Sequence, residues 1–358
     1  MTSAPTRSFA RIGRGVLAFG AALLGTWAVL IIALGASREG HDEPWRIVVA
    51  VAFALTLLAA GARLRFWVAT RVVVAASAAV TVGFALVPAR ADREWAPDLV
   101  RASYATFAGP LVTVHDVRDF RYRSTSDFDP HWYDATYDTR DLLTGYFVVE
   151  PFSGFYGAAH TFVSFRFRPR AAPIDGSRDR FLAVSVETRR ERGEHFSVLR
   201  GLLKGYELAY VAGDERDLID LRVRFRHDDV YVYPVAATHE RLVAYFLDIV
   251  RRMTALRGRP EYYDALRSNC TTNLASHLER ITDVDVPRLD RRLLLPADSD
   301  SLALELGLID ATGDLASLRR RFRVPPEVAD EVAGRAGYSQ RIRGEDGRAG
   351  GTSFDTAR

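Results

Sequence analysis

The sequence predicts an α+β domain preceded by a cluster of hydrophobic helices. Three observations support this fold class. Residues 15–88 are almost entirely apolar, whereas the rest of the 358-residue chain has an ordinary soluble composition. Short alternating runs typical of strands occupy residues 102–235, and apolar residues at helical spacing follow from Thr238. The length suits an anchor plus one domain of roughly 200–250 residues.

Three membrane spans are predicted at the N-terminus. Residues 15–35 carry no charge and are long enough to cross a hydrocarbon core of about 30 Å as a helix. Residues 44–62 and 66–88 give two further spans, each with one arginine near its start. The chain is therefore divided into an anchor, a globular domain and a disordered tail at residues 1–90, 91–343 and 344–358.

Arginine placement predicts the orientation of these spans. One group precedes the first span and another surrounds the turn between the second and third: Arg7, Arg11, Arg14, Arg63, Arg65 and Arg71. The positive-inside rule puts both groups in the cytoplasm. We therefore expect a multi-pass protein of a bacterial inner membrane, with its C-terminal domain in the periplasm.

Two other interpretations of the N-terminus remain open. Small residues at the end of the first span, Ala33, Gly35, Ala36 and Ser37, suit a cleaved signal peptide. The domain would still lie outside the cytoplasm, because two spans would remain. If the chain had only two membrane spans in total, the C-terminal domain would lie in the cytoplasm.

Periodicity predicts the elements of the globular domain. Residues 160–167 and 181–188 alternate between two faces and form a predicted β-hairpin. Residues 218–225 and 230–235 form a second predicted strand pair. Helices are expected from Thr238, from near Cys270, over 302–309 and over 326–333.

Cys270 is the most informative residue for chemistry. It follows Ser268 and Asn269, either of which can cap a helix, so the thiol is expected in the first helical turn. Backbone N–H groups and the helix dipole stabilise a thiolate there, and the same N–H groups can receive an oxyanion. Because it is the only cysteine, it forms no disulfide within the chain.

A thiolate nucleophile needs a base, and His160 is the best candidate. It begins a predicted strand, and the partner strand offers Ser185 and Glu187, either of which could orient the imidazole. A buried structural cysteine and a structural strand histidine are the alternatives for Cys270 and His160. Spacing alone does not link two residues that are 110 positions apart.

No metal site, cofactor or nucleic-acid partner is predicted. His277 stands two turns after Cys270, but no further ligand at a suitable spacing accompanies the two residues. The net charge of +3 gives no argument for nucleic-acid binding.

Several segments around these residues resemble one family. GAAHTFVSFRF, FLAVSVETRRERGEHFSVLRGLLKGYELAYVAGDERDLIDLRV, DDVYVYPV and SNCTTNLASHLER are similar to the Lnb N-terminal periplasmic domain family, over about residues 92–343. The resemblance implies a permuted papain-like domain, as in the NlpC and lecithin:retinol acyltransferase groups, with an antiparallel sheet and packed helices. It implies catalytic roles for His160 and Cys270, with Asn269 preceding the nucleophile.

The same resemblance implies a function. The proteins that give the family its name are lipoprotein N-acyltransferases, whose further membrane helices follow the domain, whereas the spans come first here. We expect an inner-membrane-anchored cysteine acyltransferase or hydrolase that forms a thioacyl intermediate. Its expected partners are membrane lipids, with lipoproteins or cell-wall peptides as further candidates. A cell-wall peptidase or amidase and a non-catalytic binding module on the same fold are the alternatives.

Overall fold

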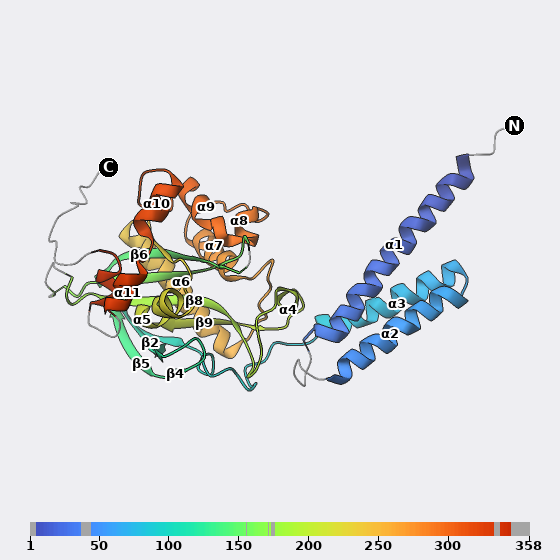
Figure 1. The fold of residues 1–358 in the computed structure, drawn as a ribbon, viewed down its shortest axis with the longest axis horizontal. Helices are drawn as coiled ribbons and strands as arrows, with labels where there is room; N and C mark the ends of the chain where they lie inside the picture. The colour runs from blue at the N-terminus through green and yellow to red at the C-terminus, as the bar shows by residue number, and fades with distance from the viewer. Residues whose placement is uncertain are drawn as a thin grey trace. The chain divides into compact units, whose positions relative to one another are not determined.

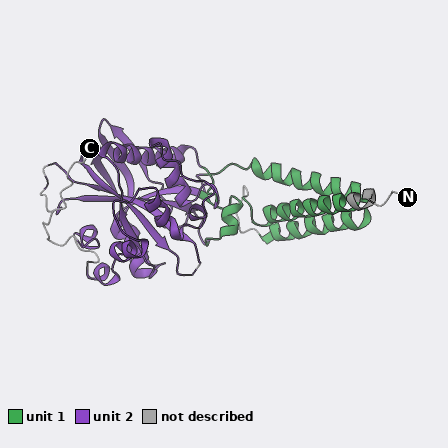
Figure 2. Ribbon diagram, turned by 90° about the horizontal axis from the view of Figure 1, so that it is seen from above, with its two compact units in different colours: residues 1–90, 195–207, 261–264 green, residues 91–194, 208–260, 265–358 purple. Residues whose placement is uncertain are grey.

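The computed structural model describes residues 5–36, 44–154, 156–170, 172, 176–332 and 337–344. The chain divides into two units, which have different colours in Figure 2. The first comprises residues 1–90, 195–207 and 261–264, and the second comprises residues 91–194, 208–260 and 265–358. The first unit therefore includes two segments from the middle of the chain. The predicted disordered tail, apart from Gly344, lies outside the described residues.

Three long apolar helices make up most of the first unit (Figure 1). They are α1 (Pro5–Leu34), α2 (Pro44–Arg63) and α3 (Phe66–Ala85), and each is long and apolar enough to cross a membrane. α1 extends back to Pro5, beyond the start of the predicted span at Gly15, and proline suits the first turn of a helix. α3 ends at Ala85, since Pro88 disfavours helical backbone in the residue before it.

The C-terminal ends of α1 and α3 lie together. A Cβ atom placed on Gly35, just after α1, would lie 2.9 Å from Cε2 of Phe84 in α3. Arg46 of α2 is buried and donates from Nε to the carbonyl oxygen of Ile32 at 3.0 Å and from Nη2 to that of Gly35. The guanidinium thereby satisfies carbonyl groups that a helix end leaves without partners. α1 and α3 thus run in the same direction.

A short helix, α4 (Val198–Leu202), belongs to the same unit. Lys204, the only lysine of the chain, donates from Nζ to the carbonyl oxygens of Phe84 and Ala85 at 3.3 and 3.1 Å. The carbonyl oxygen of Leu203 accepts from the backbone N–H of Ala36 at 3.1 Å. The segment 195–207 is therefore fixed to the ends of both α1 and α3.

An eight-stranded mixed sheet forms the centre of the second unit (Figure 1). The strand order is β1-β2-β9-β8-β7-β6-β10, and β5 also pairs with β2. The strands are β1 (Tyr104–Ala108), β2 (Leu111–Arg118), β5 (Trp132–Asp138), β6 (Leu142–Pro151), β7 (Ala159–Phe167), β8 (Arg180–Arg189), β9 (Glu207–Gly213) and β10 (Tyr231–Pro234). β3 (Arg121–Tyr122) and β4 (Phe128–Asp129) pair separately. The α+β class is confirmed.

The predicted hairpin is also confirmed. β7 and β8 pair antiparallel, with Phe162 opposite Ser185. Because residues two apart point to the same face of a sheet, His160 and Phe162 share one face with Ser185 and Glu187. Thr161 points to the other face. All nine residues of β7 are buried, which is expected of a strand covered on both faces.

The strand predicted over 218–225 is wrong. α5 (Glu215–Asp220) begins after the cap Asp214, whose side chain accepts from the N–H of Arg216, and a π-helical turn continues it over Leu221–Phe225. The buried carboxylate of Asp217 accepts from the guanidinium of Arg118 at 2.7 Å. The alternating side chains suggested a strand, but capping and buried ion pairs favour the helix. β10, the predicted partner, pairs with β6 instead.

Helices of the second unit follow β10. They are α6 (His239–Gly258), α7 (Cys270–Ile281), α8 (Arg291–Leu294), α9 (Ser299–Glu305), α10 (Leu315–Phe322), α11 (Pro326–Val332) and α12 (Tyr338–Arg341). Thr238 caps α6 as predicted, because its hydroxyl accepts from the N–H of Arg241. α9 begins earlier than the predicted helix over 302–309. α6 and α7 contact each other, and they pack on β6 and β7 respectively.

Candidate active site

A capping box places Cys270 in the first turn of α7. The side-chain oxygen of Asn269 accepts from the N–H of Thr272 at 2.8 Å, and the hydroxyl of Thr272 accepts from the N–H of Asn269 at 2.8 Å. The N–H groups of Cys270 and Thr271 have no partner within the helix, because the first turn lacks preceding carbonyl groups. The thiol is therefore next to donors that can stabilise negative charge.

His160, at the start of β7, lies next to Cys270. The Sγ atom is 4.0 Å from the carbonyl oxygen of Ala159, the residue before His160. The hydroxyl groups of Thr161 and Thr271 are 3.0 Å apart and hydrogen-bonded, which ties the start of α7 to β7. The fold thus brings together the two residues that the sequence alone could not link.

Thiol and imidazole change each other's pKa. Burial raises the pKa of Cys270, but a hydrogen bond with His160 and its positive charge outweigh burial and lower that pKa to about 7. Burial lowers the pKa of His160, but the charge of Glu187 and the interaction with Cys270 raise it to about 9. Opposite charges therefore stabilise each other here, and a large share of the thiol is thiolate near neutral pH.

Ser185 and Glu187 occupy the other side of the imidazole. Nε2 of His160 lies 2.6 Å from Oγ of Ser185 and 3.3 Å from Oε1 of Glu187. Ser185 donates its hydroxyl proton to Oε1 of Glu187 at 2.6 Å. Because Nε2 is directed at these groups, Nδ1 is the ring nitrogen left for the thiol. The carboxylate acts on His160 both directly and through the serine hydroxyl.

A buried ion network holds Glu187 in place. Arg222 donates to Oε1 of Glu187 at 3.2 Å and to Oε2 of Glu150 at 2.6 Å. Glu150 lies opposite His160 in the β6–β7 ladder and is completely buried. Sequence reasoning missed both residues, because Arg222 was expected on a strand. The only available signal was an acidic residue, Glu150, at the end of an apolar strand.

Asn269 occupies a capping position. Its Nδ2 atom donates to the carbonyl oxygens of Ala265 and Leu293 at 3.0 and 3.2 Å, while its oxygen accepts from Thr272. Both amide hydrogens are therefore used, and the helix-start N–H groups are the donors left for an oxyanion. The structure gives Asn269 a structural role beside the thiol, and a direct catalytic role for it stays a prediction.

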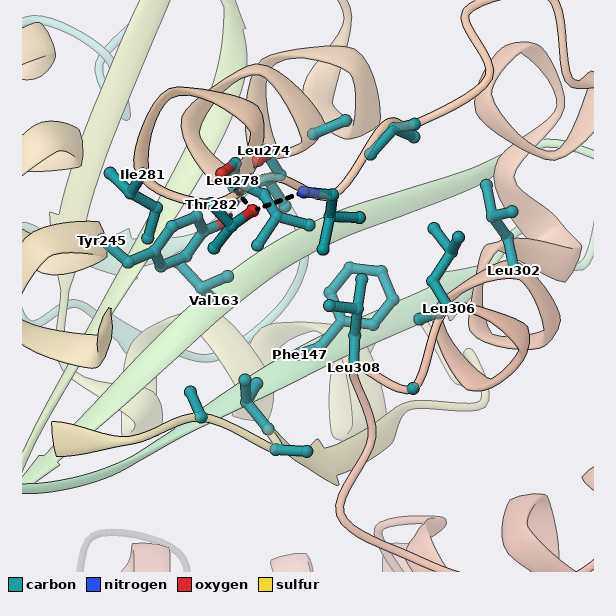
Figure 3. A pocket seen from close by; sticks show the side chains of 18 of the residues that line it. Phe147, Val163, Tyr245, Leu274, Leu278, Ile281, Thr282, Leu302, Leu306 and Leu308 are labelled. Atoms are coloured by element: carbon teal, nitrogen blue, oxygen red, sulfur yellow. Dashed lines mark hydrogen bonds between the residues drawn. The ribbon is translucent and has the colours of Figure 1, made fainter. Parts of the chain in front are cut away.

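An apolar cavity of about 220 Å³ lies along α7 (Figure 3). Thr271, the neighbour of Cys270, lines it together with Leu274 and Leu278, which lie further along the helix. Apolar and aromatic side chains from α6, the end of α7, β6, β7 and the α9 region surround the same space. They include Phe147, Val163, Tyr245, Ile281, Leu302, Leu306 and Leu308.

His277 belongs to a separate buried cluster. Its Nε2 and Nδ1 atoms lie 2.7 Å from the hydroxyl of Tyr210 and 2.6 Å from the carboxylate of Asp248. Burial lowers the pKa of His277 to about 4, so the ring is neutral at neutral pH. Among the residues that the structure describes, no group of three or more His, Cys, Asp or Glu could hold a metal ion.

Comparison with known families gives one match that covers the whole candidate site. The family model for the Lnb N-terminal periplasmic domain matches residues 128–303. This range contains His160, Ser185, Glu187 and Cys270. Neither the curated proteins nor the solved structures give a match to the chain.

Proposed function

The chain belongs, through residues 128–303, to the Lnb N-terminal periplasmic domain family, and on this premise we propose that it is a membrane-anchored periplasmic cysteine acyltransferase or hydrolase. The family and the three candidate membrane helices support a periplasmic domain with a membrane anchor. We extend this to a three-span anchor in the inner membrane and to a permuted papain-like domain, in which the histidine strand precedes the cysteine helix. One observation carries the catalytic part: Cys270 begins α7 beside His160, which contacts Ser185 and Glu187.

In the first half of the proposed reaction, the thiol takes an acyl group from an ester. Nδ1 of His160 accepts the thiol proton, and the thiolate attacks the ester carbonyl carbon. The N–H groups of Cys270 and Thr271 stabilise the oxyanion of the tetrahedral intermediate. The bond to the leaving alcohol oxygen then breaks, the alcohol takes the proton from His160, and the acyl group remains on Cys270 as a thioester.

In the second half, an acceptor removes the acyl group. An amine, such as the N-terminus of a lipoprotein, or a water molecule loses a proton to His160 and attacks the thioester carbonyl. The carbon–sulfur bond breaks, and the leaving thiolate of Cys270 is regenerated. Transfer to an amine gives an amide, and transfer to water gives a free acid.

The apolar cavity supports a lipid acyl group as the substrate in preference to a peptide. Its lining begins at Thr271, next to the nucleophile, and continues along α7 over Leu274 and Leu278. A cell-wall peptide carries charges and amide groups, which need polar partners when they are buried. A hydrocarbon chain needs only the aliphatic and aromatic contacts that this cavity provides.

The proposed function is tested by intact-protein mass spectrometry. Wild type and Cys270→Ser are incubated with native phospholipids, after titration shows that the wild-type thiol is reduced. We expect a fatty-acyl adduct on wild type that hydroxylamine removes, and none on the variant.

The alternatives give different results. If folded wild type with a reduced thiol acquires no fatty-acyl mass, lipid acyl transfer is rejected, and a peptide fragment trapped on the thiol would identify a peptidase. A Cys270→Ser variant that replaces wild type fully in a deletion strain would identify a binding module.

A further inference from the structure

The segment 195–207 of the first unit presents an apolar surface. The exposed fractions of Phe196, Val198 and Leu199 are 48%, 45% and 41%. Gly201 and Leu203 of the same segment are buried. Three large apolar side chains exposed within four residues are unfavourable in water, and such a patch indicates a binding surface.

This surface lies at the ends of two helices that can cross a membrane. Lys204 donates to the last carbonyl groups of α3, at Phe84 and Ala85. The carbonyl group of Leu203 accepts from Ala36, just after α1. Because both helices are long enough to cross the hydrocarbon core, their common end marks the boundary between hydrocarbon and water.

The segment is held in a defined conformation at this level. The hydroxyl of Tyr206 donates to the carbonyl oxygen of His195 at 2.7 Å and accepts from the N–H of Ser197 at 2.8 Å. The rings of Phe196 and Tyr206 stack with centroids 6.0 Å apart. Lys204 lies 5.0 Å from the ring of Phe84. Aromatic and basic residues of this kind are typical of membrane–water interfaces.

We propose that residues 196–199 are an interfacial anchor, which inserts Phe196, Val198 and Leu199 into the leaflet that surrounds the common end of α1 and α3. The occupant of the surface is thus the bilayer itself. Burying these exposed side chains in the acyl boundary removes them from water. The anchor acts independently of any chemistry at Cys270.

Site-directed spin labelling tests this anchor in the full-length protein. In a Cys270→Ser background, which has no other cysteine, Val198→Cys is labelled with a nitroxide and reconstituted in phosphatidylethanolamine–phosphatidylglycerol vesicles. Collision rates are measured with oxygen, which concentrates in hydrocarbon, and with a nickel chelate, which stays in water. Leu58→Cys on exposed α2 is the lipid reference, and Leu289→Cys, with an exposed fraction of 92%, is the water reference.

The inference requires that the oxygen-to-nickel ratio at position 198 exceed that at position 289 several-fold and approach that at position 58. A ratio equal to the one at position 289 would place the segment in water and overturn the inference. Low collision rates with both reagents would show cover by protein, such as a second copy of the chain, and would also overturn it. Leu199→Cys repeats the measurement, so a single poorly folded variant does not decide the outcome.

Discussion

At the scale of single residues, Oε1 of Glu187 contacts three residues around the candidate active site. Oε1 of Glu187 accepts from Ser185 and Arg222 and lies 3.3 Å from Nε2 of His160. Arg222 is also paired with Glu150, so it neutralises Glu187 only in part. The remaining negative charge stabilises an imidazolium at His160, which in turn stabilises the thiolate of Cys270.

Replacing His160 by Ala should shift the reactivity of Cys270 to higher pH. In wild type the midpoint of alkylation by iodoacetamide should lie near the thiol pKa of about 7. Without the imidazole, burial still raises the thiol pKa, and only the hydrogen bonds with Thr161 and the helix start oppose it, so the midpoint should move to higher pH. Mass spectrometry of the single cysteine measures the rate at each pH. An unchanged midpoint would show that His160 does not activate the thiol.

His277 should make the protein less stable as the solution becomes acidic. Its pKa is lowered in the folded state from 6.5 to about 4, so its stabilising contribution is complete above pH 6.5 and is lost as the pH falls towards 4. The loss amounts to about 3 kcal/mol once the pH is below the folded pKa. Thermal unfolding of His277→Gln should therefore depend less on pH over this range than that of wild type. His131→Gln, at a largely exposed side chain, is the control.

At the scale of secondary-structure elements, α7 combines three tasks. Its N-terminus holds Cys270, its cap depends on Asn269, and its further turns line the apolar cavity. The sequence predicted this helix start correctly, because capping residues act locally. The strand predicted over residues 218–225 was wrong. Asp217 and Arg222 are paired with buried residues of distant strands, and local alternation of side chains does not reveal such partners.

Substituting Asn269 by Ala should lower the free energy of unfolding by about 2 kcal/mol. Loss of the cap costs about 1 kcal/mol, and the lost amide bonds to Ala265 and Leu293 add a similar amount. Denaturant titration measures the change. Asn269→Ser keeps a capping oxygen and should lose less, and an equal loss in both variants would argue against the cap.

Filling the cavity should separate acyl transfer from thiol reactivity. Ala275 lines the cavity, so Ala275→Leu should reduce formation of the fatty-acyl adduct on the order of tenfold. Alkylation by iodoacetamide should stay at the wild-type rate, because that reagent is small. Ser276→Leu, the next position on α7, is the matched control. Equal adduct formation in Ala275→Leu and wild type would exclude this cavity as the acyl site.

At the scale of the whole molecule, features that follow from composition, chemistry or family resemblance could be predicted from the sequence, whereas contacts between distant elements could not. The three candidate membrane helices follow from composition, and His160 and Cys270 follow from chemistry and family resemblance. The register of β7 and β8 brings His160 together with Ser185 and Glu187, and the sequence does not show this register. The contact of Arg222 with Glu187 depends on a helical turn where alternating side chains predicted a strand. Segment 195–207 is joined to the first unit by hydrogen bonds that involve backbone carbonyl groups, such as those of Phe84 and Leu203. Because every residue has a carbonyl group, the sequence does not predict these bonds.

The orientation of the chain should be visible in reporter fusions. Alkaline phosphatase joined after Arg358 should be active, because it folds only outside the cytoplasm, whereas green fluorescent protein exported at the same point should stay dark. Fusions after Arg63 should give the opposite pair of results. A fluorescent C-terminal fusion would return the domain to the cytoplasm and contradict the three-span topology.

Because Lys204 is the only lysine, limited proteolysis can follow the opening of the segment around it. A lysine-specific endopeptidase has a single cleavage site in the sequence and would yield only the fragments 1–204 and 205–358. In the folded protein this side chain is engaged by the end of α3 through two carbonyl groups. Cleavage therefore requires local opening of the surrounding segment. The rate of cleavage after Lys204 therefore measures how often segment 195–207 opens, and the protein needs no engineered label.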